Sequence, residues 1–179
     1  MYKIYSVKSL YKILIILLMM IVMGGCEEAK KVIEISGNVK SIGNHISVNG
    51  TTNLKKGSKL KVELRDIEIN HVIEKHNVNV KEDGVFNVNF SRDDRGEDHK
   101  LVVNFYPHEQ TEQIQKIYGA AGGLISEHSQ GYVQYSKEGN DVSGIQMFDF
   151  IYKVEKGSVG QRTFLLDHFE NPNAVSGEE

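Results

Sequence analysis

The seven histidines are the first residues of this sequence that could carry catalysis or bind a metal. Glu74 and His76 stand two positions apart, so on a β-strand their side chains would lie on one face and could supply two ligands. A zinc site needs three or four protein ligands, and no third ligand stands at a compact spacing from this pair. We therefore interpret the histidines as solvated polar residues and predict neither a metal site nor a cofactor. The full set is His45, His71, His76, His99, His108, His128 and His168.

The segment 91–100, SRDDRGEDHK, is the most charged part of the chain and offers the oxygen ligands that Ca²⁺ prefers. An EF-hand loop needs acids at fixed alternate positions with a distal glutamate, and this segment lacks that order. Arg92 and Arg95 also stand among the acids, which favours charges that pair with one another in a hairpin loop. A calcium site is the alternative interpretation. The acids concerned are Asp93, Asp94, Glu97 and Asp98.

Motifs for a serine nucleophile or a phosphate-binding loop are incomplete in the sequence. A nucleophile elbow reads Gly-x-Ser-x-Gly, and Ser143–Gly144 does not complete one. The segment 118–126, YGAAGGLIS, lacks the Gly-Lys-Ser/Thr of a phosphate cradle and fits a helix end followed by a loop. We predict no catalytic residues. A small exported hydrolase or metal-dependent enzyme stays an alternative, which a convergent pocket with a shifted pKa would favour.

Asparagines recur on the polar faces of the predicted strands. Neutral amides along a sheet could hydrogen-bond sugars or the edge of a peptide. The alternative is a solubilising face that avoids repulsion between like charges. The binding residues therefore stay unknown at this stage. The asparagines concerned are Asn77, Asn79, Asn87, Asn89 and Asn104.

The only cysteine, Cys26, follows an apolar run and two glycines in the segment KILIILLMMIVMGGC. The run Ile13–Met23 has eleven residues, whereas a bilayer-spanning helix needs about 20, so its length fits the h-region of a signal peptide. Three lysines and no acids precede it. This order resembles a bacterial lipoprotein signal, with Met23 where leucine is commonest. The resemblance implies cleavage before Cys26 and acyl chains, such as palmitate, that anchor the protein in the membrane. An uncleaved signal anchor and an ordinary buried thiol are the alternatives.

Export changes the charge of the chain and limits its partners. Three of the 21 basic residues and none of the 24 acidic residues lie in the first 25, so a chain that begins at Cys26 has a formal charge of −6. An acidic protein of this kind is a poor candidate for binding nucleic acid, so we predict no such partner. With Cys26 acylated, no cysteine remains for a disulfide, and a hydrophobic core must hold the fold.

Apolar and polar residues alternate with a period of two over most of the exported part. The clearest segments are KLKVELRDI, VFNVNF and KLVVNFY, which place Leu60, Val62, Leu64, Phe86, Val88, Phe90, Leu101, Val103 and Phe105 on the buried sides. Such alternation indicates antiparallel strands with one face on a core. The segments GYVQYS and VSGIQMFDFIYKVEK also predict strands, with Ile145, Met147, Phe148 and Phe150 as core candidates.

Turn residues separate these strands, and one segment predicts a helix. Glycine-containing turns are expected at Gly57, at Asp83–Gly84, which is the strongest hairpin signal, and at Gly139–Asn140. The segment HEQTEQIQKIYGAAGG carries Ile114, Ile117 and Tyr118 at helical spacing and can end at Gly119. Beyond Lys156 the pattern fades, and RTFLLDHF fits a last short helix or strand.

The predicted organisation has four parts. These are a signal peptide over residues 1–25, a lipidated cysteine with a short tether over 26–31, a β-sandwich over 32–155 and a partly disordered tail over 156–179. The segments ISVNGTTNLKKGSKLKVEL, VKEDGVFNVNF and KLVVNFYPHEQTEQIQKIYGAAGGLIS resemble uncharacterised bacterial exported proteins and lipoproteins that share a G-x-T-N-L-x-x-G-x-K-L phrase. The resemblance spans Ile46 to Ser126 and implies an all-β, immunoglobulin-like antiparallel sandwich with one short helix. Lys55–Lys56 departs from the Pro-Asp that is frequent at that turn.

The resemblance brings no catalytic residues, so it supports a fold and not an activity. The expected function is that of a membrane-anchored, non-enzymatic binding or structural module on the extracytoplasmic face of the cell membrane. Its partner would be an envelope protein, a peptide or a wall glycan. A solute-binding component of a transporter is the other alternative, although such proteins have two α/β lobes and this pattern is rich in β-strands.

Overall fold

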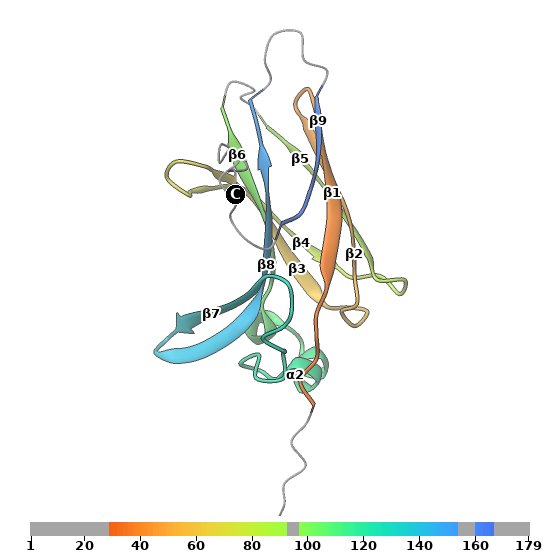
Figure 1. Cartoon of the computed structure of the whole chain (residues 1–179), viewed down its shortest axis with the longest axis vertical. Helices are drawn as coiled ribbons and strands as arrows, with labels where there is room; N and C mark the ends of the chain where they lie inside the picture. Colours follow the sequence, from red (N-terminus) through yellow and green to blue (C-terminus); the bar gives the residue numbers. More distant parts are fainter. Residues whose placement is uncertain (1–28, 93–96, 154–159, 167–179) are drawn as a thin grey trace, which may run out of the picture.

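The computed structural model describes residues 29–92, 97–153 and 160–166, and they form two antiparallel sheets packed face to face (Figure 1). The strands run along the long axis of the molecule. A helix and its loops lie at one end, where the described chain begins. The predicted class, an all-β antiparallel sandwich with one short helix, is confirmed.

The smaller sheet has four strands in the order β5-β2-β1-β9. Their bounds are β1 Ile35–Ile42, β2 His45–Thr52, β5 Val85–Ser91 and β9 Gln161–Phe164. A two-residue turn joins β1 to β2 and contains Gly43 at a φ of 60°, which glycine adopts without strain. This hairpin was not predicted from the sequence.

The larger sheet has five strands in the order β4-β3-β6-β8-β7. Their bounds are β3 Lys59–Asp66, β4 Val72–Asn79, β6 His99–Phe105, β7 Tyr132–Lys137 and β8 Asn140–Ile151. The predicted turn between β7 and β8 is present, with Glu138 and Gly139 both at positive φ. Both positive values fit the turn type that matches the twist of a hairpin.

The inward residues of both sheets form one hydrophobic core. The alternating residues predicted for β3, β5 and β6 all belong to it, as do Ile145 and Met147 of β8. The ring of Phe86 lies across Gly50, its partner on the neighbouring strand β2, in the position where a side chain would otherwise stand. Glycine is therefore required at residue 50 by packing, because the ring fills the space of a Cβ.

The Asp83–Gly84 turn exists, but it does not form the predicted hairpin. Gly84 has a φ of 77°, and an added Cβ would overlap the carbonyl oxygen of Thr52. The strands on either side, β4 and β5, belong to different sheets. The turn therefore carries the chain from one sheet to the other, and Val80 just before it is buried in the core between them.

Phe148 and Phe150 are buried as predicted, but together with Val102 they form a second, smaller cluster outside the main core. Their register partners on β6 are Val102 and Lys100, whose side chains point to the outer face of the five-stranded sheet. The inward position between the two phenylalanines is occupied by Asp149, which is 3% exposed. Side chains in this apolar run therefore alternate between the inner and outer faces of the sheet, and apolar residues occupy both faces.

Strand β9 extends the sandwich past the predicted boundary at residue 155. It pairs with β1, and the Gln161 side chain bonds the backbone of Phe150 in β8 and of Tyr152 just after β8. Thr163 faces inward and donates a hydrogen bond to the Asp149 carboxylate. Burial raises the pKa of Asp149 to about 6, while the bonds from Thr163 and the Phe150 N–H oppose that shift.

The helical end of the sandwich is closed by the predicted short helix and by a 3₁₀ turn that was not predicted. The 3₁₀ helix η1 spans Pro107–Glu109, and α2 spans Glu112–Tyr118 with Thr111 before it and Gly119, at a φ of 78°, after it. The first described strand approaches through this end, where Lys31 exchanges backbone hydrogen bonds with residues 124 and 126. These bonds tie Lys31 to the loop that follows α2.

Candidate functional site

The outer face of the four-stranded sheet is mainly polar, with Ile42 exposed at one end of it. We call it the amide face. Cross-strand register places its side chains in rows, since directly paired residues of antiparallel strands point the same way. The amide face consists of Ser36, Asn38, Lys40, Ser47, Asn49, Thr51, Asn87, Asn89, Arg162 and Phe164.

The central row of the amide face crosses all four strands. Phe164 of β9 pairs with Asn38, Asn38 pairs with Asn49, and Asn49 pairs with Asn87 of β5. The Asn87 amide donates to Asn49 Oδ1 at 2.9 Å, and Lys81 Nζ donates to Asn87 Oδ1 at 3.1 Å. These amides keep further donors and acceptors directed at solvent, so the row can bond a polar ligand at several points.

The next row combines two cations without a neighbouring acid. Lys40 and Arg162 are direct register partners, and both side chains are exposed. Neither forms an ion pair with any residue that the structure describes. Like charges directly opposite each other on a sheet repel, so the fold itself gains nothing from this pair.

A shallow hollow lies beside this surface and joins its polar and apolar parts. It is lined by Ser36, Gly37, Asn38, Asn49, Thr51, Phe164 and Leu165. Phe164 is 64% exposed, and the Arg162 guanidinium lies 5.9 Å from its ring centroid. An exposed ring beside short polar side chains offers a flat, accessible surface on which another ring can stack.

Only part of this surface was visible in the sequence. Asn87 and Asn89 were predicted as binding candidates, and both lie on the amide face. Asn38 and Asn49, which complete the central row, were missed. They stand in strands whose alternation is interrupted by glycines at residues 37 and 50, and only the register aligns them with Asn87.

The remaining predicted asparagines lie on the other sheet. Asn77 and Asn79 point outward from β4, while Asn104 is buried on the outer side of β6. Asn104 Oδ1 accepts a bond from the Gln146 amide at 2.9 Å, and its own Nδ2 has no partner among the described residues. The five predicted asparagines therefore do not form one surface.

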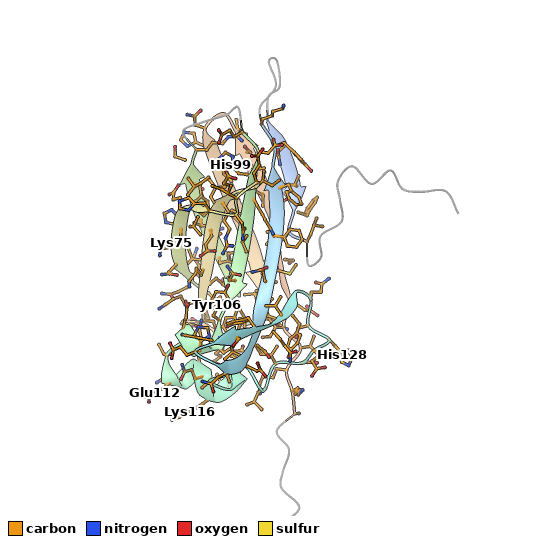
Figure 2. The ribbon with its side chains drawn as sticks, turned by 90° about the vertical axis from the view of Figure 1, so that its left-hand side faces the viewer. Lys75, His99, Tyr106, Glu112, Lys116 and His128 are labelled. Carbon is orange, nitrogen blue, oxygen red and sulfur yellow. The ribbon has the colours of Figure 1, made fainter. Side chains whose placement is uncertain are left out.

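An aromatic cluster lies at the lower part of the five-stranded sheet, where Figure 2 labels Tyr106. The Tyr106 ring contacts both His108 and Tyr135, and the Tyr135 hydroxyl lies 3.0 Å from His108 Nδ1. Burial lowers the pKa of His108, which favours the neutral ring, and this ring shares a hydrogen bond with the Tyr135 hydroxyl. Lys61 bonds Glu109 at 2.7 Å beside this cluster. The polar groups bond one another and fasten the β7–β8 hairpin to η1.

The structure separates the predicted histidines. His76 does share a face with Glu74, and the two bond at 2.6 Å, with the His76 ring edge-on to Phe90. His99 is buried at the end of the sandwich opposite α2, contrary to the interpretation of a solvated residue, and its Nδ1 bonds the Glu97 carbonyl (Figure 2). Within the described ranges no three histidine, cysteine, aspartate or glutamate side chains are placed to hold a metal. His168 lies outside the described residues.

Acids line a hollow near the same end, but they do not converge. It is bordered by Asp66, Ile67, Glu68, Glu97, Asp98 and Lys153. Asp66 accepts the N–H groups of Glu68 and Ile69, which holds its pKa below the usual value. Asp98 accepts the Lys153 N–H at 2.6 Å. Asp93 and Asp94, the other calcium candidates, lie outside the described residues.

The remaining sequence candidates have other roles or lie elsewhere. Ser143 Oγ lies 2.9 Å from the Tyr132 hydroxyl, so this serine is paired with a phenol rather than with a base. Cys26 precedes the described residues. Among the helices of the described part, none is long and apolar enough to cross a membrane. Comparisons with protein-family models, with curated proteins and with solved structures find no match.

Proposed function

We propose that this protein is a bacterial lipoprotein, anchored through Cys26 on the extracytoplasmic face of the cell membrane, whose sandwich is a non-enzymatic binding module of the cell envelope. The anchoring part of the proposal is supported by the sequence order of lysines, apolar run, two glycines and Cys26. The binding part is supported by one surface, the amide face.

The observation that carries the binding proposal is the charge of that face. A chain beginning at Cys26 has a formal charge of −6, yet the outward residues of β1, β2, β5 and β9 include no aspartate or glutamate. Solubility alone would be served by acids on every face of such a protein. A surface of amides, hydroxyls, two cations and one exposed ring is instead suited to bind a polar partner.

The position of the amide face also suits a tethered module. The face lies along the side of the sandwich, and the described chain begins at the α2 end (Figure 1). Ile33 donates its N–H to Ser129 Oγ at 2.9 Å, so the first described residues are tied to the body of the domain. A partner approaching from the side would not have to displace the residues at this end.

The experiment is a co-purification of the tagged full chain from crosslinked cells, extracted in mild detergent. Wild type should fractionate with the membrane and bring a partner with it, whereas Cys26→Ala should leave the membrane. Asn49→Glu, in the centre of the amide face, should lose the partner. Asn77→Glu is the matched control, because it adds the same charge to the other sheet. Membrane retention of Cys26→Ala would overturn the anchor, and equal recovery of the partner with both glutamate variants would overturn the site.

A further inference from the structure

We infer that the amide face binds a polysaccharide that carries negatively charged groups. The inference rests on the proposed function, because it names the ligand class of the same surface. In this arrangement sugar rings lie over the row from Phe164 to Asn87, and a negatively charged group lies between Lys40 and Arg162.

The cation pair indicates a negatively charged ligand. Lys40 and Arg162 face each other across β1 and β9 without an acid among the outward residues of these strands. Lys81 adds a third cation at the far side of the central row, where it bonds Asn87. An anion placed between Lys40 and Arg162 would convert their mutual repulsion into two favourable contacts. One acid, Glu34, lies beside Ser36 and Thr51 at the opposite end of the face, so the end with Lys40 and Arg162 is the one complementary to an anion.

The central row indicates sugars rather than a peptide. Sugar hydroxyls donate and accept hydrogen bonds, which matches the two-way capacity of the Asn38, Asn49 and Asn87 amides. The C–H face of a sugar ring can rest on Phe164, since that ring is 64% exposed at the end of the row. A peptide strand, by contrast, would add to the free edge of a sheet, and the amide face is the flat side of one. Four strands about 4.8 Å apart give a row roughly 14 Å long, enough for a short stretch of polysaccharide.

The side chains of this face are short, which brings a ligand close to the sheet. Serine, threonine and asparagine predominate, and Ser36 bonds Thr51 at 3.0 Å within the row beside the asparagines. The surface is therefore preorganised by its strands, and binding would order few long side chains other than Lys40 and Arg162.

The test uses the purified full chain in detergent and three defined polymers. Dextran sulfate is a sulfated polysaccharide, dextran is its neutral counterpart, and poly-glutamate is a polyanion without sugars. Binding is measured by thermophoresis. We expect dextran sulfate to bind at least about tenfold more tightly than either other polymer, and we expect added salt to weaken that binding.

Variants assign the binding to the amide face. Lys40→Gln/Arg162→Gln and Phe164→Ala should each weaken dextran sulfate binding about tenfold, and only the first should reduce the salt dependence. Lys55→Gln/Lys75→Gln removes the same charge from exposed sites elsewhere and should change affinity by less than about twofold. Unchanged denaturation midpoints show that the variants remain folded.

Each other outcome overturns the inference. If dextran binds as tightly as dextran sulfate, the ligand need not be charged. If poly-glutamate binds as tightly, the ligand need not be a sugar. If no polymer binds, the face does not bind charged polysaccharide. Equal effects of the two lysine-containing double variants would place binding off the amide face. If the co-purification described above yields an envelope protein lost with Asn49→Glu while no polymer binds, the proposed function stands and the polysaccharide inference fails.

Discussion

Gly50 shows how one missing side chain shapes the sandwich beneath the amide face. The Phe86 ring occupies the space of a Gly50 Cβ, so Gly50→Ala must displace that ring from a closed core. We expect the substitution to lower the free energy of unfolding by about 1–3 kcal/mol, the usual cost of overpacking. Urea denaturation of the purified protein measures this change.

A second glycine provides the control for that measurement. A Cβ at Gly123 would meet nothing within 4 Å, so Gly123→Ala should change the free energy of unfolding by less than about 0.5 kcal/mol. If both variants lose the same stability, packing against Phe86 is not the reason for glycine at residue 50.

Asp149 gives a prediction that depends on pH. Its pKa is raised from 3.8 to about 6 because the carboxyl group is buried between β8 and β9. The folded state therefore holds a proton more tightly than the unfolded state. The stability linked to this proton is present at low pH and is lost as the pH rises from about 4 to about 6.

Replacing this carboxyl group should remove the pH-dependent loss. Between pH 4.5 and 7.5 the effect of Asp149→Asn on the free energy of unfolding should shift by about 2 kcal/mol in favour of the variant. Denaturation curves of both proteins at the two pH values measure the shift. A constant difference between them would show that Asp149 titrates normally. Thr163→Val removes the hydroxyl that donates to the Asp149 carboxylate and opposes the rise of its pKa. This variant should therefore lose more stability than the wild type between the lower and the higher pH.

The β7–β8 hairpin depends on one hydrogen bond outside the sheet. Tyr135→Phe leaves His108 Nδ1 without its hydrogen-bond partner, and we expect the free energy of unfolding to fall by about 1 kcal/mol, with faster amide exchange in β7. Hydrogen exchange followed by mass spectrometry reports the local change. Tyr152→Phe is the control, because Tyr152 is 40% exposed. Unchanged protection of β7 in Tyr135→Phe would mean that the sheet alone holds the hairpin.

Local elements could be predicted from the sequence, whereas relations between elements could not. The helix was found because Ile114, Tyr118 and Gly119 are within one another's reach along the chain. The Asp83–Gly84 turn was also found, but the same residues fit a hairpin or a crossing between sheets. In the structure the turn connects two sheets, with Val80 buried and Gly84 against the carbonyl oxygen of Thr52. These contacts depend on residues distant in the sequence, so the turn residues alone could not separate a hairpin from a crossing.

The candidate site was only half predicted for the same reason. Asn87 and Asn89 alternate with apolar neighbours in one strand, so their exposure could be read locally. Their alignment with Asn38 and Asn49 arises from strands that lie far apart in the sequence. Phe164 stands in a segment for which either a helix or a strand was expected, and it is exposed because its pairing with Asn38 points it to the outer face of the sheet.

The outer faces of the two sheets differ in how their charged side chains are paired. The five-stranded sheet carries paired charges on its outer side, such as Arg65 with Glu63 and Lys61 with Glu109. The amide face carries cations without acids. In an acidic chain, cations without acids on the four-stranded sheet would favour the approach of a negatively charged partner to that sheet.

The most direct test of a tethered binding face is photocrosslinking in living cells. A benzophenone amino acid is placed at Asn49, on the amide face, or at Asn77, on the outer face of the five-stranded sheet, in otherwise wild-type full-length protein. We expect a crosslinked product from residue 49 that carries polysaccharide, no such product from residue 77, and loss of the product when Cys26→Ala is added. Equal products from both positions, or a product from residue 77 alone, would contradict this expectation.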